Sequence, residues 1–187
     1  MGLTVAVLLT ACGADPVFDN EYAPSFSFNV GWHKGCIIED ALSIAGTFVF
    51  ISVPTDGNPR FVITPSNPDR EEVLLPVSEI ERRALEAQRQ SPWGTMGINR
   101  RLLVGTSNFD GLKAFDGHCP SCHAETGRRD YPLTWTENHQ HVGCANCGRV
   151  YNPNGNGSLM NAKGSSDRNL KNYGVDYNGQ ILTVRNK

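Results

Sequence analysis

Four of the six cysteines in this 187-residue chain form two Cys-x-x-Cys pairs, in the stretches HCPSCHAETG and HVGCANCGRVYN. Two thiolates separated by two residues can lie on one tight turn with their sulfurs about 3.7 Å apart, which is the edge of a tetrahedron with metal–sulfur bonds of about 2.3 Å. Two such turns complete a four-sulfur site. The spacing therefore predicts a metal centre with Cys119, Cys122, Cys144 and Cys147 as its ligands.

The residues around the two pairs fit such a site. The 21 residues between Cys122 and Cys144 slightly exceed the usual spacing of a two-pair zinc site, and a hairpin between the turns accommodates the surplus. Gly148 follows the last cysteine, where a positive φ lets backbone N–H groups point at the sulfurs. We expect Gly148, His123 and His141 to surround the ligands without coordinating the metal.

Two other chemistries are open to the same cysteines. In an oxidising compartment the four thiols can pair as disulfides. One Cys-x-x-Cys pair alone can act as a redox dithiol. We favour a metal because disulfide frameworks seldom use two paired tight turns, and because a thioredoxin-type dithiol needs a helix directly after its first cysteine, where we predict none. Cys36 has no evident partner, and we expect it to be a small buried residue.

The composition points to a turn-rich globular protein without a surface for nucleic acid. Hydrophobic residues make up 39% of the chain and charged residues 19%, with 19 glycines and 11 prolines. The net charge of -2 supplies no basic face for phosphates, so we expect no nucleic-acid partner. The sequence also lacks a glycine-rich phosphate loop and the common hydrolase motifs.

The first residues, MGLTVAVLLTACGAD, carry an export pattern. The apolar run from Leu3 to Leu9 is too short to span a bilayer and ends on small residues, as secretory signals do. Leu-Thr-Ala-Cys-Gly resembles the lipobox of bacterial lipoproteins, which implies a signal peptide over 1–11, lipid on Cys12 and a tether over 12–25. We expect anchorage to the bacterial cell envelope, with another envelope protein as candidate partner. The alternative is an N-terminal strand that buries Cys12.

Most of the remaining chain has the pattern of β-strands. The β-branched and aromatic runs at 46–53 and 60–65 predict a hairpin, and the Asn-Gly turn at 178–179 predicts another. Further strands are expected at 26–30, 101–106, 112–115, 133–135, 139–142 and 149–151.

One helix is predicted, over residues 77–90. Ser78 and Glu81 form a capping box at its start. Ile80 and Ala84 fall on one face, and we interpret the segment as a surface helix that covers a sheet edge.

From about Arg101 to Lys187 the chain resembles a Rieske-type domain. LLVGTSNFDGLKAFDGHCPSC is similar to the strand–turn–strand that leads to the first metal loop of that family. CANCGRVYNPNGNG is similar to the second loop, with Tyr151 at an aromatic position, and LKNYGVDYNGQILTVRN resembles the closing hairpin. The resemblance implies an all-β fold: a Rieske-like β-sandwich over 26–187, with a rubredoxin- or zinc-ribbon-like metal-binding subdomain inserted at about 116–152 and one helix.

The chain departs from that family at the ligands. Rieske loops bind a [2Fe–2S] cluster through two cysteines and two histidines, and here Cys122 and Cys147 stand in place of the histidines. Four thiolates suit one zinc or iron ion, or an all-cysteine [2Fe–2S] cluster. We predict structural zinc in an exported binding or scaffold protein, with electron transfer through iron as the alternative. A closed four-sulfur zinc site has no open coordination position, so we expect no catalysis there.

Overall fold

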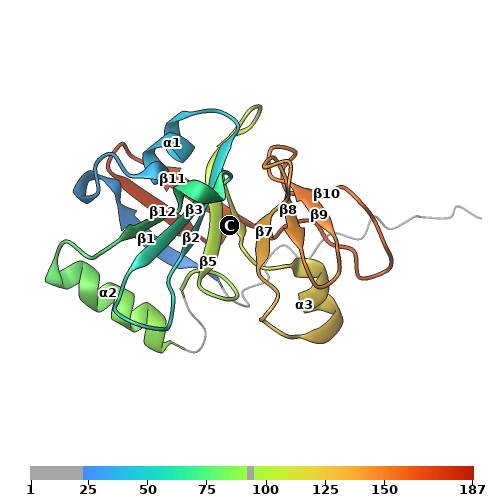
Figure 1. Cartoon of the computed structure of the whole chain (residues 1–187), viewed down its shortest axis with the longest axis horizontal. Coiled ribbons are helices and arrows are strands. Elements are labelled where there is room, and N and C mark those ends of the chain that lie inside the picture. Colours follow the sequence, from blue (N-terminus) through green and yellow to red (C-terminus); the bar gives the residue numbers. More distant parts are fainter. Residues whose placement is uncertain (1–22, 92–94) are drawn as a thin grey trace, which may run out of the picture.

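The structure is a computed structural model that describes residues 23–91 and 95–187 (Figure 1). The expected signal peptide, Cys12 and most of the expected tether lie outside the described residues. Within the described ranges, no helix is both long enough and apolar enough to cross a membrane.

An eight-stranded antiparallel sheet, curled into a half-barrel, forms the main body (Figure 1). Its strands are β1 (Ser25–Asn29), β2 (Thr47–Ser52), β3 (Phe61–Pro65), β4 (Glu72–Leu74), β5 (Arg101–Ser107), β6 (Gly111–Asp116), β11 (Asn172–Tyr177) and β12 (Ile181–Arg185). Their spatial order is β1-β12-β11-β6-β5-β2-β3-β4. The two predicted hairpins are confirmed, because β2 pairs with β3 and β11 pairs with β12.

A second, four-stranded sheet is inserted between β6 and β11. Its strands are β7 (Leu133–Trp135), β8 (Val142–Cys144), β9 (Val150–Asn152) and β10 (Ser158–Leu159), and they pair in the order β10-β9-β8-β7. In the main sheet β6 and β11 are neighbours, with Asn172 opposite Phe115. Residues 117–171 therefore form one insertion that leaves the main sheet after β6 and returns to it at β11. The subdomain expected at about 116–152 lies within this segment.

The described part of the chain contains three α-helices, so the prediction of a single helix is wrong. The missed helices are seven residues long, too short for a helical period to stand out in the sequence. The helices are α1 (Ile37–Ser43), α2 (Glu79–Gln90) and α3 (Pro120–Thr126), with short 3-10 helices η1 (Val30–Trp32) and η2 (Pro68–Arg70).

The helix α2 begins at the predicted N-cap, and its buried face does not include Ile80. The Ser78 side chain accepts a hydrogen bond from the backbone N–H of Glu81, which confirms the N-cap. Leu85 and Glu81 are buried, whereas Ile80 is 75% exposed. The Glu81 carboxylate is paired with His33, whose Nε2 lies 2.9 Å from Oε1, and this pairing makes its burial tolerable.

The central strands are buried on both faces, and each face belongs to a different core. On β2, Val49 and Ile51 join the core inside the curled sheet. Phe48 and Phe50, which alternate with them, join a second core between the two sheets. Burial on both faces explains why β2 reads as a continuous apolar run. The second core also contains Leu103, Phe115, Cys119, Cys122, Leu133, Val142, Cys144, Tyr151 and Leu170.

Candidate metal centre

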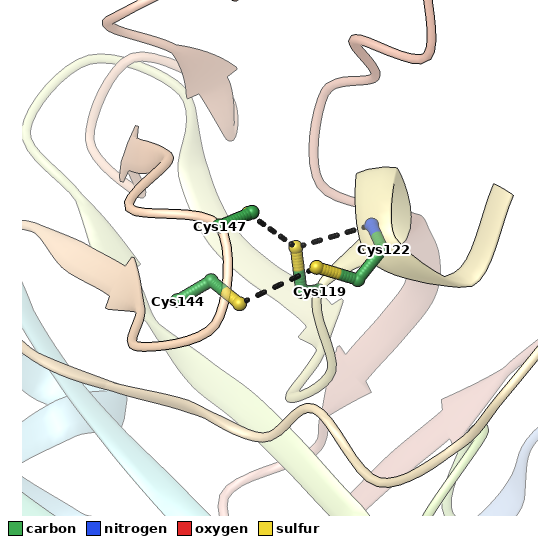
Figure 2. Close-up of side chains that lie close together, drawn as sticks. All are labelled: Cys119, Cys122, Cys144 and Cys147. Atoms are coloured by element: carbon green, nitrogen blue, oxygen red, sulfur yellow. Dashed lines mark hydrogen bonds between the residues drawn. The ribbon is translucent and has the colours of Figure 1, made fainter. Parts of the chain in front are cut away.

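The four predicted ligands lie together, and Figure 2 shows their side chains converging. Every sulfur lies within 4.8 Å of the other three. Cys119 Sγ is 3.7 Å from Cys147 Sγ, and Cys122 Sγ is 3.6 Å from Cys144 Sγ. These separations match the edge of a sulfur tetrahedron around one ion with bonds of about 2.3 Å. The four cysteines can therefore hold a metal.

The first pair is positioned by the N-terminus of α3. Cys119 is the N-cap, and Pro120 takes the first helical position, where a missing N–H is tolerated. The backbone N–H of Cys122 donates to Cys119 Sγ over 3.5 Å. The presence of α3 overturns the expectation that no helix follows Cys119, which was one reason for disfavouring a redox dithiol. Burial is a better argument against a redox dithiol, since Cys119 and Cys122 are both 0% exposed and therefore closed to a disulfide substrate.

The second pair is positioned by the turn between β8 and β9. Cys144 is the last residue of β8, and its N–H donates to the carbonyl of Arg149 over 3.0 Å. The N–H of Gly148 donates back to the Cys144 carbonyl over 2.8 Å. Gly148 has φ +66°, which confirms the predicted left-handed conformation. Cys147, within this turn, is half-buried, whereas the other three ligands are buried.

Polar side chains not recognised as functional from the sequence lie beside the sulfurs. The Tyr151 hydroxyl lies 3.4 Å from Cys119 Sγ, and Ser121 Oγ lies 3.1 Å from that hydroxyl. Asn146 Nδ2 donates to Cys122 Sγ over 3.4 Å. Hydrogen bonds of this kind stabilise thiolates and orient them for a metal. The only sequence signal for Ser121 and Asn146 is that each lies inside a Cys-x-x-Cys pair.

The four thiols differ in their acidity. Burial raises the pKa of Cys119 to about 11, against the opposing effect of the Tyr151 hydroxyl. Burial also raises the pKa of Cys122 well above its usual range. At Cys147 burial acts in the same direction, but hydrogen bonds from the backbone and side chain of Arg149 prevail and lower the pKa to about 7. Buried thiols with raised pKa values are poor nucleophiles, whereas a bound cation stabilises them as thiolates.

Arg149 joins the second cysteine turn to the surrounding segments. Its side chain is buried, and Nε donates to Asp167 Oδ1 over 2.7 Å while Nη2 lies 3.1 Å from Glu125 Oε1. Glu125 belongs to α3, and Asp167 belongs to the segment that follows β10. Lys163 of that segment donates from Nζ to the carbonyl of Cys147 over 2.7 Å. Two cations therefore lie beside a group of four sulfurs that is anionic when it binds a divalent ion.

The histidines expected near the ligands contact other groups. His123 Nδ1 lies 3.1 Å from the carbonyl of Arg128, and His141 Nδ1 accepts from Asn138 Nδ2 over 3.0 Å. Among the described residues, the group of ligand atoms within 4.8 Å consists of the four cysteines alone.

The cysteines of the described chain are all free. Sulfurs 3.6 to 3.7 Å apart are well beyond the bond length of a disulfide, about 2.05 Å. The alternative of pairwise disulfides is therefore not what the structure contains. Cys36 is buried in the core of the main sheet, as predicted.

Fold and site together define a β-rich protein with a four-cysteine group that can bind a metal. No model of a known protein family matches the chain, and no curated protein or solved structure matches it significantly. The function is therefore inferred from the geometry of the site itself.

Proposed function

We propose that the four cysteines hold one zinc ion, and that the ion has a structural role. The observation that carries this proposal is the convergence of all four sulfurs within 4.8 Å of one another. In a two-iron cluster, thiolates on different irons are further apart than thiolates on one iron, because the metal–metal separation lies between them. Mutual proximity of all four favours a single ion. With four thiolates bound, zinc has no position left for a substrate.

A structural role follows from the small size of the inserted sheet. Its strands are two or three residues long. Apart from the cysteines, its contribution to the second core is small, with Leu133, Val142 and Tyr151 as the fully buried side chains. A structural zinc site contributes about 10–16 kcal/mol of apparent binding free energy. That is enough to hold α3 against the turn between β8 and β9.

The proposed setting is the bacterial cell envelope, where the protein is a lipoprotein with a Rieske-like domain and a binding or scaffold role. Support for export comes from the Leu-Thr-Ala-Cys-Gly pattern that ends at Gly13. Support for the Rieske-like domain comes from the order of β6, two metal loops and the β11–β12 hairpin. Replacing Cys12 by serine should move the protein from the membrane fraction to the soluble fraction of its host. Equal membrane retention of both forms would contradict lipid attachment.

Electron transfer through a single iron is the second candidate. The observation in its favour is the set of hydrogen bonds to sulfur from Tyr151, Asn146 and the backbone of Cys122. Hydrogen bonds to sulfur ligands tune the reduction potential of iron sites. The half-buried Cys147 offers the shortest path from such a site to a partner at the surface.

Metal analysis of the purified protein separates these functions. We expect one zinc per chain and no visible absorption. One iron per chain with a red colour would contradict bound zinc and support the electron-transfer function. Two irons with acid-labile sulfide would contradict a single-ion site. Cys147→Ser should lower the metal content, whereas Cys36→Ala, in the core of the main sheet, should keep one metal per chain. Equal metal content in both variants would contradict the ligand assignment.

A further inference from the structure

A cleft of about 310 Å³ lies between the two sheets. On the main sheet its wall includes Phe48 of β2 and Asn108 of the turn between β5 and β6. On the small sheet its wall includes Trp135 at the end of β7, Gln140, and Asn152 at the end of β9. In the β7–β8 pair, Trp135 lies opposite Val142 and Leu133 lies opposite Cys144. The cleft is therefore at the opposite end of this hairpin from the cysteines.

The lining of the cleft is polar, and His139 and His141 are its only ionisable side chains. Among the lining residues there is no aspartate, glutamate, lysine or arginine. The side-chain amides of Asn108, Gln140 and Asn152 make no hydrogen bond to the described part of the chain. Each amide offers one acceptor and two donors. The cleft thus gathers unused donors and acceptors in a setting without carboxylates, lysine or arginine.

The aromatic part of the wall is held in place before any ligand arrives. Trp135 donates from Nε1 to the carbonyl of Thr64 over 3.2 Å and packs edge-on against Phe50, with ring centroids 5.4 Å apart. The turn that carries Asn108 is fixed as well, because its backbone N–H donates to Asn154 Oδ1 over 3.1 Å. Preformed walls lower the entropic cost of binding.

We propose that this cleft binds a neutral saccharide. Sugar hydroxyls both donate and accept, and side-chain amides match them in both roles. The apolar C–H faces of a sugar ring pack on aromatic side chains such as Trp135. The absence of lysine and arginine disfavours phosphorylated or acidic sugars, which would lose hydration without a permanent compensating charge. The volume lies at the lower end of small-molecule sites, about 300–1,000 Å³, which suits one or two sugar rings.

The test uses the metal-loaded full chain with nitrogen-15 label, so that the indole N–H of Trp135 reports on the cleft by NMR. The probes are glucose, galactose, N-acetylglucosamine, maltose and cellobiose. We expect a saturable shift of the Trp135 signal with a dissociation constant of about 1 mM for at least one probe. Tighter binding of the disaccharides indicates the end of a glycan chain as ligand, and equal binding of the monosaccharides indicates a free sugar. Glucose 6-phosphate and glucuronate should bind more weakly than glucose.

Alanine variants of the lining residues test whether the saccharide binds in this cleft. Gln140→Ala and Asn152→Ala should each lower the affinity for the tightest-binding saccharide about tenfold, because each removes hydrogen bonds to sugar hydroxyls. The matched control Asn58→Ala removes an exposed amide outside the cleft and should leave the affinity unchanged. Zinc content and thermal unfolding of each variant report whether the fold is intact. The proposal is overturned if no probe shifts Trp135, if the acidic sugars bind as tightly as glucose, or if folded Gln140 and Asn152 variants bind like the control.

Discussion

Arg149 Nε lies 2.7 Å from Asp167 Oδ1, and this contact joins the second cysteine turn to the segment that follows β10. The other carboxylate oxygen of Asp167 accepts from the backbone N–H groups of Lys163 and Gly164, at 2.6 and 3.0 Å. One carboxylate thereby shapes the segment and also orients the guanidinium beside Cys147. The side chains that surround the four cysteines therefore come from segments far apart in the sequence.

Replacing Arg149 by methionine should weaken metal binding. The variant keeps an apolar stem of similar length but removes the cation and the donors that stabilise the Cys147 thiolate. Loss of a residue that supports a metal ligand typically lowers metal affinity about 10- to 100-fold. Competition with a chromophoric chelator measures this change. The control is Arg83→Met on α2, whose guanidinium bonds Glu79. Equal affinity in both variants would show that Arg149 does not support the site.

Replacing Tyr151 by phenylalanine should affect the metal without unfolding the second core. The change removes the hydroxyl near Cys119 Sγ and keeps the buried ring. We expect about tenfold weaker zinc binding. In protein loaded with iron, voltammetry should show a more negative reduction potential, because a hydrogen bond that favours the reduced site is lost. Tyr177→Phe on β11 is the control, and a potential that does not differ between the two variants would refute a role for the hydroxyl.

Replacing Gly148 by alanine should strain the second cysteine turn. A side chain at φ +66° costs about 1–2 kcal/mol, and the added Cβ would lie 2.8 Å from Lys163 Nζ. The lysine side chain is flexible, so most of the cost is backbone strain. The unfolding free energy of the metal-loaded protein should fall by about that amount in denaturant titration. Gly164→Ala, where a Cβ meets nothing within 4 Å, should be nearly neutral. Equal losses in the two variants would contradict the role assigned to the conformation.

Asp116 should make stability depend on pH. Burial raises the pKa of its carboxyl to about 6, against hydrogen bonds from Tyr173, Ile98 and His118 and the charge of Lys171. The folded state therefore holds the proton more tightly than the unfolded state. Asp116 therefore contributes about 3 kcal/mol to the free energy of unfolding below about pH 4. This contribution is lost as the pH rises through about 6.

The variant Asp116→Asn isolates this effect, because the remaining groups titrate alike in both proteins. The stability of the wild type relative to Asp116→Asn should decline between pH 4.5 and pH 7.5. Urea titrations at the two values measure it. A difference that stays constant or rises with pH would contradict a raised pKa.

The local features of the fold could be predicted from the sequence. The β2–β3 and β11–β12 hairpins follow from alternating strands and turn residues close in sequence, and the cysteine spacing predicted which four sulfurs lie together. The helix α3 could not be predicted, because its seven residues are too few for a helical period to stand out, and because Cys119 and Cys122 at its start indicate a metal-binding turn instead. The pairing of β1 with β12 joins the two ends of the described chain, and no local pattern specifies it.

The contacts made by the polar side chains around the cysteines could not be predicted from the sequence either. Tyr151 stands 32 positions beyond Cys119, and Arg149 reaches Asp167 across 18 positions. Such contacts arise only when the insertion of residues 117–171 folds back on itself. The buried face of α2 could not be predicted from its apolar residues for a similar reason, since the pairing of Glu81 with His33 places a carboxylate in the interior while Ile80 is exposed.

The most direct test is X-ray absorption spectroscopy of the metal in the protein as purified. A single ion held by the sulfurs of residues 119, 122, 144 and 147 predicts a zinc edge and one shell of four sulfurs at about 2.3 Å, with no second metal nearby. A metal neighbour in the second shell, or a first shell with nitrogen or oxygen in place of any sulfur, would contradict it.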